Sequence, residues 1–495
     1  MNHRRVARLT LALGALSALA GGALAMLLRW QLAFPGRPVP LVGAVLFPVD
    51  DGAVGARRYA ALLTAHGTVM IFFALGPMLI QGLSTAALPR LCGRDEMALP
   101  RWSVAALALQ SLATLLLAAS ALSPLGGAMA GWIGLAPLST DAYSPGFGTS
   151  LWLLSLLVAV ASTLAHAANT VATVVTRPRS LPWTALPLAA WGWFFAAALN
   201  LLFAPVLAAA SALLLSDRAL GTRRFIAAMG GPASAGGDPL LHQHLFWVFG
   251  HPEVYVLILP VWGIVADALS HAAERPPAGY RAVVASMAAV TALSGAVYGH
   301  HLFATGLSAG LAQAFMALTL VISLPSSVFV WSWAMTARGG LSRPSPASRY
   351  ALATAGVFAA GGLTGLHLGV IPTDLYLHDT HFVVGHLHLV MAASLLFGLF
   401  TAVHHFAGDL LARPLSPRVA RWHLWLSLVG ALVAFGAMLR LGFLGMPRRV
   451  WSVSAYRYLD GAAPWNLAAT AGAYLLGAAQ LLLVVDLTRA RRGAP

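Results

Sequence analysis

The sequence has no lysine, a single cysteine and few charged residues, and each shortage excludes a class of structure. Because the 30 basic residues are all arginine, any mechanism that needs an intramembrane lysine is excluded. Cys92 alone can form neither an internal disulfide nor a metal site with several thiolate ligands. Charged residues make up 9% of the chain and hydrophobic residues 59%, whereas soluble domains carry roughly 25% charged residues. The chain is therefore expected to be a polytopic membrane protein.

Apolar runs of the length that crosses a bilayer, about 20 residues, recur along the whole chain. They predict an all-α membrane protein of about twelve transmembrane helices. No long polar insertion divides the chain, so residues 1–495 are expected to form one domain. A signal peptide could explain the first run, but the run continues to Arg29, which favours a retained helix. The expected spans lie near residues 7–31, 62–89, 102–131, 150–176, 184–214, 242–272, 282–303, 308–337, 348–373, 381–407, 422–445 and 464–488.

The arginines are unevenly divided between the two sets of alternating loops. More of them, such as Arg90, Arg177 and Arg275, fall on the side of the two termini than on the other side, where Arg57 and Arg218 lie. The positive-inside rule then places both termini in the cytoplasm, as in a multi-pass protein of the bacterial inner (cytoplasmic) membrane. Basic loops in contact with membrane lipid account for the net charge of +15, so no nucleic-acid partner is expected.

One apolar stretch, HQHLFWVFGHPEVYVLILP from His242, carries three ionisable side chains close together. Such groups are costly inside a membrane and indicate a functional site. His251 and Tyr255 are four residues apart, so on a helix they share a face, whereas Glu253 points roughly the other way. The pattern predicts a metal ligand with a phenol beside it, and a separate buried acid on the opposite side.

Six histidines fall at related depths in the expected spans: His66, His251, His300, His301, His386 and His388. Imidazole suits iron, copper and zinc, and haem iron takes axial histidine. His386 and His388 are two residues apart and face opposite ways on a helix, so that helix could ligate two haems, one on each flank. His251, His300 and His301 could supply three nitrogens to a non-haem metal, which leaves His66 to pair with one of the other two.

Five separated motifs carry a resemblance to a known family. They are HGTVMIFF from His66, HQHLFWVFGHPEVY from His242, VYGHHLF from Val297, LHDTHFVVGHLH from Leu377 and GMPRR from Gly445. In this order they resemble subunit I of the haem-copper oxidases, in the branch with HPEVY to which cytochrome c oxidase belongs. The resemblance covers nearly the whole chain.

The resemblance implies a terminal respiratory oxidase that reduces O2 to water at a high-spin haem and copper-B, with electrons arriving through a low-spin haem. It also implies proton uptake, proton pumping and two haems, expected to be of the a type. The implied partners are cytochrome c, a subunit II with copper-A, and other oxidase subunits. For the metal sites it implies that His66 and His388 hold the low-spin haem, His386 holds the high-spin haem, and His251, His300 and His301 hold copper-B.

Further residues take roles from the same resemblance. Tyr255 is expected to be linked covalently to His251 and to supply an electron and a proton, and Glu253 to donate protons. Arg448, Arg449 and Asp374 match groups near the haem propionates. Arg29 matches a residue that contacts a substituent of the low-spin haem, and Trp247 matches a tryptophan that packs beside copper-B. His378 and Asp379 match a non-redox magnesium site.

The proton pathways depart from the family pattern. Phe329 occupies the position of the K-pathway lysine and cannot exchange protons, so Ser326 with waters is the residual route expected there. Glu96 aligns with the aspartate at the entrance of the D-pathway, so an acid is kept, whereas the asparagine before it aligns with Thr85.

Other functions remain open at this stage. Quinol-oxidising relatives place a histidine and a glutamine shortly before the haem-ligating histidine, where this chain has Arg58 and Ala61. Nitric oxide reductases lack the tyrosine of HPEVY, which this chain has. A redox-degenerate, non-catalytic paralogue is a further alternative, against which the complete set of ligands argues.

Overall fold

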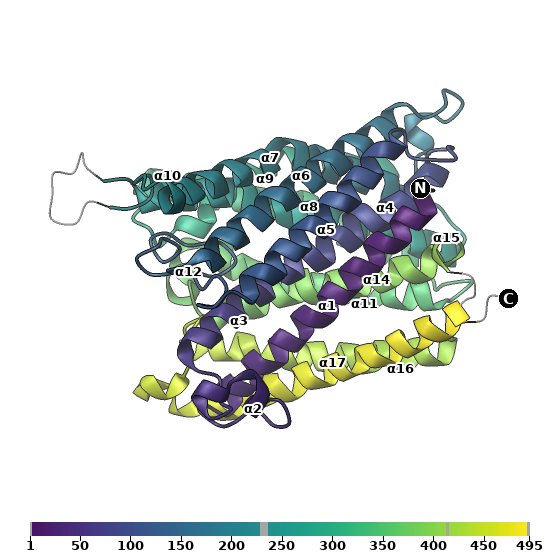
Figure 1. The fold of residues 1–495 in the computed structure, drawn as a ribbon. Helices are drawn as coiled ribbons and strands as arrows, with labels where there is room; N and C mark the ends of the chain where they lie inside the picture. The colour runs from purple at the N-terminus through teal and green to yellow at the C-terminus, as the bar shows by residue number, and fades with distance from the viewer. Residues whose placement is uncertain (1, 228–235, 412–414, 493–495) are drawn as a thin grey trace.

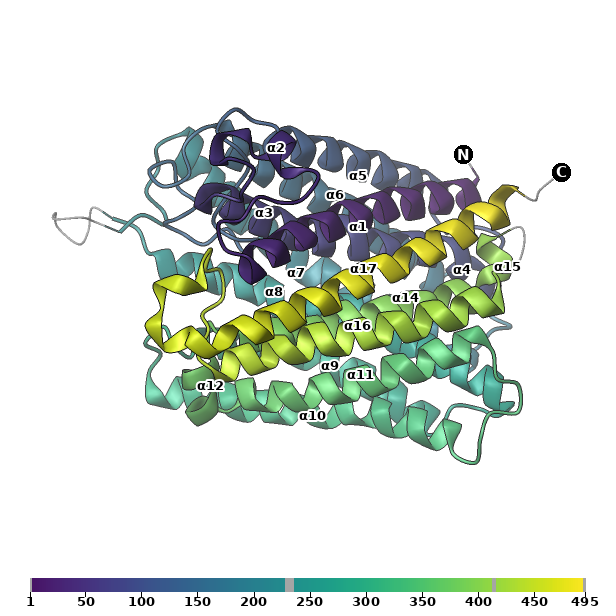
Figure 2. The same ribbon diagram turned by 90° about the horizontal axis from the view of Figure 1, so that it is seen from below.

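The computed structural model describes residues 2–227, 236–411 and 415–492. In that part of the chain the regular structure is helical, apart from one isolated bridge between Thr380 and Pro447. The long helices run side by side between two ends of the molecule (Figure 1). Both chain termini lie at one end, called the terminal end below, together with α15 (Ala407–Leu410). The opposite, or far, end carries α2 (Gly43–Leu46) and α12 (Ile371–Leu377), as a second view confirms (Figure 2).

Eleven helical segments of the described chain are long and apolar enough to span a membrane. A twelfth apolar helix, α9 (Tyr280–Ser294), is shorter and is followed by the 3₁₀ segment η5 (Tyr298–Leu302). The fold class predicted from the sequence is thus confirmed. The eleven segments are α1 (His3–Ala33), α3–η2–α4 (Ala56–Leu91), α5 (Pro100–Ala121), α6 (Phe147–Val175), α7 (Leu188–Ala219), α8 (Pro239–Ala273), α10 (Ala309–Ala337), α11 (Pro346–Gly369), α13–η6–α14 (His381–His405), α16 (Pro417–Phe443) and the last span, η8–α17 (Arg457–Ala490).

The helix boundaries follow from capping residues and breakers. Proline stands in the first turn of α5, α8, α11 and α16, where its missing N–H costs nothing. Asp238 and Ser345 accept backbone N–H groups at the starts of α8 and α11. The span expected near 102–131 was too long, because α5 ends at Ala121. Pro124, Gly126 and Gly127 follow within six residues, and these residues stop a helix even in an apolar run.

The helix α8 lies at the centre of the bundle. In its most apolar stretch 83% of the residues are buried, whereas in that of α10, at the periphery, 11% are buried. Glycines allow α7 to approach α8 closely, since a Cβ atom added at Gly263 would lie 2.2 Å from the carbonyl oxygen of Leu188. The HPEVY stretch is therefore enclosed by protein, whereas few residues of the most apolar stretch of α10 are fully buried.

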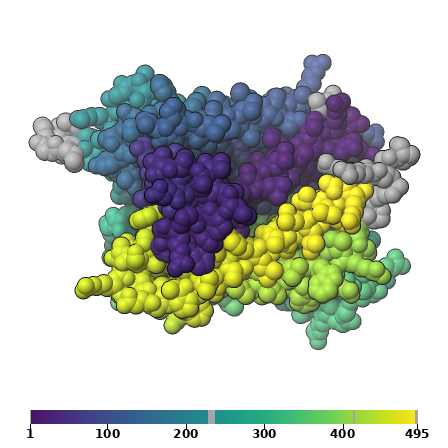
Figure 3. Space-filling model, turned by 60° about the horizontal axis from the view of Figure 1, so that its bottom comes forward, coloured from purple at the N-terminus to yellow at the C-terminus, as the bar shows by residue number. Residues whose placement is uncertain are grey.

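The far end is covered by the connecting segments. The residues that follow α1 pack against those that precede α17, where Figure 3 shows purple atoms lying against yellow ones. Val39, Phe47 and Leu459 belong to one apolar cluster there, and the indole N–H of Trp451 donates to the carbonyl of Val54 at 2.6 Å. The connecting segments therefore form a packed apolar layer at the far end.

Candidate metal centres

The six histidines singled out in the sequence come from five elements of the bundle. His66 lies in α3 (Ala56–Thr68), His251 in α8, and His300 and His301 in η5. His386 lies in α13 (His381–Leu387), and His388 begins the π-helical segment η6 (His388–Ala393). A second π-helical segment, η2 (Val69–Gly82), starts three residues after His66. Such segments are frequent at functional sites, and here they adjoin the histidines that face each other.

His66 and His388 form a facing pair. Their ring centres are 6.2 Å apart and their planes differ by 7°. The Nδ1 atom of His66 lies 2.9 Å from the carbonyl oxygen of Gly21, and Nδ1 of His388 lies 2.8 Å from that of Val384. A carbonyl can only accept, so each Nδ1 carries the hydrogen and each Nε2 keeps a lone pair for a metal. Metal–imidazole bonds are about 2 Å long, so the separation fits one metal ion between the rings.

His251, His300 and His301 form a three-nitrogen group. One ring nitrogen from each lies within 4.8 Å of the others, and Nδ1 of His251 is 3.3 Å from Nε2 of His301. Thr319 Oγ1 lies 2.9 Å from Nδ1 of His300 and orients that ring. The indole of Trp247 stacks on His301 with ring centres 3.7 Å apart and planes 7° apart. Three imidazoles held in this way fit copper or zinc.

The predicted arrangement of the HPEVY residues is confirmed on α8. The hydroxyl of Tyr255 lies 3.2 Å from Nε2 of His251, so the two side chains share a face and Nδ1 of His251 is left for the metal. Glu253, which is buried, instead lines a cavity on another side of the helix. The phenol is therefore placed at the three-histidine group, and the carboxyl group is not.

His386 faces away from His388, as their spacing predicted. Its Nδ1 lies 3.1 Å from the carbonyl oxygen of Gly361 and 2.9 Å from Oγ1 of Thr364, both on α11. Because both contacts are made by Nδ1, neither of them occupies Nε2. A Cβ atom at Gly365 would lie 2.9 Å from Cε1 of His386, so glycine is needed for the ring to pack there. One turn further along α11, Gly369 packs against Thr319, the partner of His300. The same stretch of α11 thus adjoins both His386 and the three-histidine group.

The far end holds the charged residues of the GMPRR and LHDT motifs. Arg448 pairs with Asp379, and His378 Nδ1 lies 2.9 Å from Oδ2 of Asp374. Burial raises the pKa of Asp374 despite its bond to His378. In Asp379 the nearby Arg448 and other cations outweigh the effect of burial and lower the pKa.

Arg449 combines an unusual backbone with a half-buried guanidinium group. Its φ of 67° is in the left-handed region, which is uncommon outside glycine. Burial, with a contribution from Arg448, lowers its pKa to about 10, so the guanidinium stays charged at neutral pH. Among the described residues it makes no ion pair. A half-buried cation of this kind fits an acidic ligand group such as a propionate.

Arg29 is buried on α1 and held by the last helix. Its guanidinium donates to the carbonyl and side-chain oxygens of Asn466 at 2.9 and 3.0 Å, and to Oγ1 of Thr470 at 3.3 Å. Tyr59 and Tyr474 also lie near it. The structure therefore fixes the position of Arg29 through α17, a relation that the sequence around Arg29 alone did not indicate.

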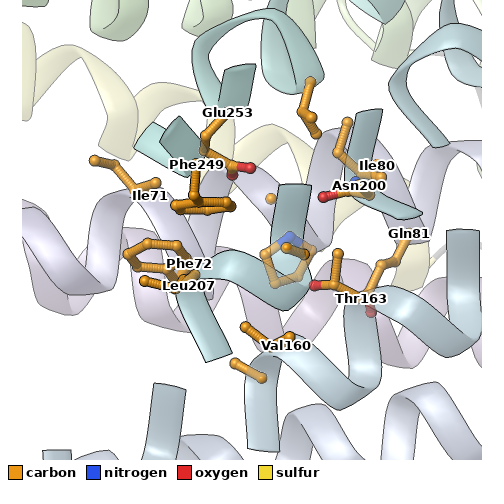
Figure 4. Close-up of a pocket in the computed structure, with 15 residues that line it drawn as sticks. Ile71, Phe72, Ile80, Gln81, Val160, Thr163, Asn200, Leu207, Phe249 and Glu253 are labelled. Atoms are coloured by element: carbon orange, nitrogen blue, oxygen red, sulfur yellow. The ribbon is translucent and has the colours of Figure 1, made fainter. Parts of the chain in front are cut away.

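Glu253 faces a cavity of about 30 Å³ that polar side chains reach from three other elements (Figure 4). Gln81, Thr163 and Asn200 share it with apolar residues. Oε1 of Gln81 and Nδ2 of Asn200 are buried without a protein partner, and a cavity of this size holds about two waters. Sequence reasoning missed Gln81 and Asn200, although a buried amide in an apolar run is the signal that could have found them.

The two expected proton-uptake positions differ in their surroundings. Glu96 is exposed in the loop between α4 (Leu83–Leu91) and α5 at the terminal end. Ser326 is half-buried on α10 and donates to the carbonyl of Ile322 in its own helix at 2.9 Å. Phe329 is fully buried and packs against Trp262, with ring centres 4.1 Å apart, and against Trp333. This aromatic cluster fills the interior beside α10.

The fold and the two histidine groups define a polytopic membrane protein that can hold haem and a copper centre within its helices. The sequence model of the family described as "Cytochrome C and Quinol oxidase polypeptide I" matches residues 5–475. The chain belongs to this family, as subunit I of the haem-copper terminal oxidases. Subunit I of this family binds haems and copper-B and works with other oxidase subunits.

The relatives match the chain over most of its length. It is 34% identical to cytochrome c oxidase subunit 1 of Cereibacter sphaeroides over 513 residues, covering 99% of this chain and 88% of the relative. It is 36% identical to cytochrome c oxidase polypeptide 1 of Halobacterium salinarum, covering 94% and 76%. A haem-copper terminal oxidase dimer solved by cryo-EM has the same fold, with a TM-score of 0.82 at 18% identity, covering 100% of this chain and 84% of that one.

Proposed function

We propose that the protein is the catalytic subunit of a cytochrome c oxidase that reduces O2 to water. The observation that carries the proposal is the division of histidines on α13–η6, where His386 and His388 face opposite flanks. His66 stands opposite His388, and the three-histidine group adjoins the same part of α11 as His386. This arrangement suits two haems and one copper ion, with the two redox sites separated by a single helix.

The ligands follow from the ring nitrogens that are left available. His66 and His388 would hold a low-spin haem, His386 a high-spin haem, and His251, His300 and His301 copper-B. When bound, the haems and copper supply electron transfer and the binding and reduction of O2. Tyr255 would hold its phenolic proton at the copper site, 3.2 Å from His251, in the position from which a proton and an electron can be given.

Proton supply is proposed to run through Glu253. Its carboxyl group is buried beside a cavity that can hold water, and that cavity opens toward polar residues of η2, α6 and α7. The route beside α10 is poorly suited, because Phe329, Trp262 and Trp333 pack together there and none of these three side chains is titratable. Protons for water formation and for any pumping would then enter from the side of Glu96.

The far-end charges fit the remaining parts of the proposal. Arg449, which is charged and unpaired among the described residues, would bind a haem propionate, as would Arg448 near Asp374. Arg29 would contact a substituent of the low-spin haem, which we expect to be of the a type. His378 and Asp379 would contribute to a magnesium site, where Mg²⁺ commonly keeps several waters.

Cytochrome c, acting through a subunit II with copper-A, is the proposed electron donor. The relatives described above are named cytochrome c oxidases, and Arg58 and Ala61 do not supply the histidine and glutamine associated with quinol. Quinol remains the second candidate because the matching family includes quinol oxidases. The proposed location is the bacterial inner membrane, with both termini in the cytoplasm.

The proposal is tested by O2 uptake of the purified complex with reduced cytochrome c and, separately, with a quinol. His301→Ala should abolish O2 uptake and lower the copper content while the low-spin haem spectrum persists, because His301 belongs to the three-histidine group and not to the His66–His388 pair. His404→Ala, a histidine elsewhere in the bundle, serves as the matched control and should keep its activity. Loss of the low-spin spectrum in His301→Ala, or uptake at the wild-type rate, would contradict the ligand assignment.

A further inference from the structure

A row of polar side chains follows the interior of α6. Ser162, His166, Asn169, Thr170 and Thr173 recur at three- and four-residue spacing, and all five are buried. Residues so spaced lie on one side of a helix. Polar groups buried in a membrane span are costly and indicate a function or a helix–helix contact. Their partners lie on η2, α4 and α5 and in the loop before α5, so the row faces the protein interior.

The terminal-end part of this row contacts the loop that carries Glu96. The N–H of Ala98 donates to Oγ1 of Thr173 at 2.9 Å, and the N–H of Leu99 donates to Oδ1 of Asn169 at 2.8 Å. The amide of Asn169 in turn donates to Oγ of Ser103 on α5 at 2.8 Å. The row therefore begins next to the surface acid.

The other part of the row reaches the cavity of Glu253. Gln81 donates to Oγ of Ser162 at 3.2 Å. Gln81 and Thr163 both line the cavity shown in Figure 4, where Oε1 of Gln81 has no protein partner. A water in the cavity can bond to that oxygen. The row thus ends at the waters that would adjoin the buried carboxyl group.

His166 occupies the middle of the row and is its only imidazole. Its Nε2 atom lies 2.8 Å from Oγ of Ser84 on α4 and 3.1 Å from Oγ1 of Thr170 on α6. A hydroxyl can donate and accept, and an imidazole nitrogen changes from acceptor to donor when it takes a proton. Histidine is also the side chain whose ordinary titration falls nearest to neutral pH. The bridge between the two hydroxyls can therefore pass a proton.

We propose that His166 is a proton relay between the loop of Glu96 and the cavity of Glu253. With its hydrogen on Nδ1, the ring takes a proton at Nε2 from the hydroxyl of Thr170, which is reprotonated by water from the side of Glu96. It then gives the proton from Nε2 to the hydroxyl of Ser84, which releases its own proton to water on the side of the cavity. The imidazole ends neutral, as it began, and no bond other than N–H and O–H changes. This role rests on the proposed oxidase function, because only consumption of protons at the metal centre gives the relay a direction. The competing interpretation is a structural one, in which His166 merely ties α6 to α4.

The test compares His166→Gln and His166→Leu with the wild-type complex. Glutamine can still bond to both hydroxyls but cannot take up a proton, whereas leucine removes the bridge. The fully reduced complex is mixed with O2, and proton uptake from the solution is followed with a pH-indicating dye, alongside the haem spectrum and steady-state O2 uptake. Both variants should slow proton uptake about tenfold or more with unchanged haem spectra.

His423→Gln is the matched control, because His423 is also buried and bonded to two side chains, Tyr350 and Gln480, but lies between α11, α16 and α17. It should take up protons at the wild-type rate. Wild-type proton uptake in His166→Gln would show that the contact is structural and overturn the relay, even if the leucine variant fails to assemble. Equal slowing in His423→Gln would overturn it as well. A wild-type complex that consumes no O2 would instead overturn the oxidase proposal.

Discussion

At the scale of single residues, backbone carbonyl groups determine which ring nitrogen can bind a metal in three of the six histidines. Gly21 and Val384 engage the Nδ1 atoms of His66 and His388, and Gly361 engages that of His386. Fixing the tautomer in this way raises the basicity of the other nitrogen and orients the ring. The candidate ligands could be read from the sequence because a histidine in an apolar span is rare and costly. Their carbonyl partners could not, since any residue supplies one.

Two single substitutions should separate the two haem sites. His388→Ala is expected to remove the low-spin haem spectrum, whereas His386→Ala is expected to remove CO binding and leave the low-spin band, because the two rings face opposite flanks. Optical spectra of the reduced complexes, with and without CO, measure both effects. If either variant lost the feature assigned to the other, the assignment of the two flanks would be reversed.

At the scale of elements, α6 and α10 differ in what they offer a proton. The row on α6 has hydrogen-bond partners both in the loop of Glu96 and at the cavity of Glu253, whereas Ser326 on α10 bonds back to its own helix beside the cluster around Phe329. A proton moves along a chain of exchangeable groups or waters. The helix α6 and its neighbours provide such groups, and the aromatic packing beside α10 does not.

Glu96→Ala should therefore slow turnover more than Ser326→Ala. We expect a loss of about tenfold for the glutamate and little change for the serine, measured as steady-state O2 uptake at matched haem content. Asp95→Ala, an exposed acid next to Glu96, controls for a general loss of surface charge. Equal effects of Glu96→Ala and Ser326→Ala would mean that the working proton route lies elsewhere.

Most of the elements could be predicted from hydrophobic runs alone, but their irregular parts could not. The spans follow from length and apolar character, and the α5 boundary was misplaced because a short apolar run continues past the helix. The π-helical segments η2 and η6 depend on tertiary packing around the histidines, for which single-sequence periodicity gives no signal. The row on α6 was visible as polar residues at helical spacing, yet its role depends on partners in α4 and in the loop before α5.

At the scale of the whole molecule, both termini lie at the same end of the bundle, in agreement with the even number of apolar helices in the described part of the chain (Figure 1). We propose from the arginine distribution that this end faces the cytoplasm. On this proposal the Arg448–Arg449 region would lie on the outer side and Glu96 on the inner side, so proton uptake and the proposed propionate-binding charges would fall on opposite faces of the membrane.

Thiol labelling checks this orientation. Cys92 is buried, so a cysteine introduced at Asp95 or at Val49 would be the exposed thiol. A membrane-impermeant reagent applied to right-side-out vesicles should label Val49→Cys and spare Asp95→Cys, with the reverse in inverted vesicles. The opposite pattern would place the termini outside and invert the proposed direction of proton uptake.

The most direct measurement of the central claim is spectroscopy of the purified complex. Reduced-minus-oxidised and CO-difference spectra measure whether a haem is bound on each flank of α13–η6. Copper analysis measures whether the three-histidine group holds its metal. The account predicts two spectrally distinct haems, of which one binds CO, with copper present. A single haem, or the absence of CO binding, would contradict a catalytic centre and favour a redox-degenerate member of the family.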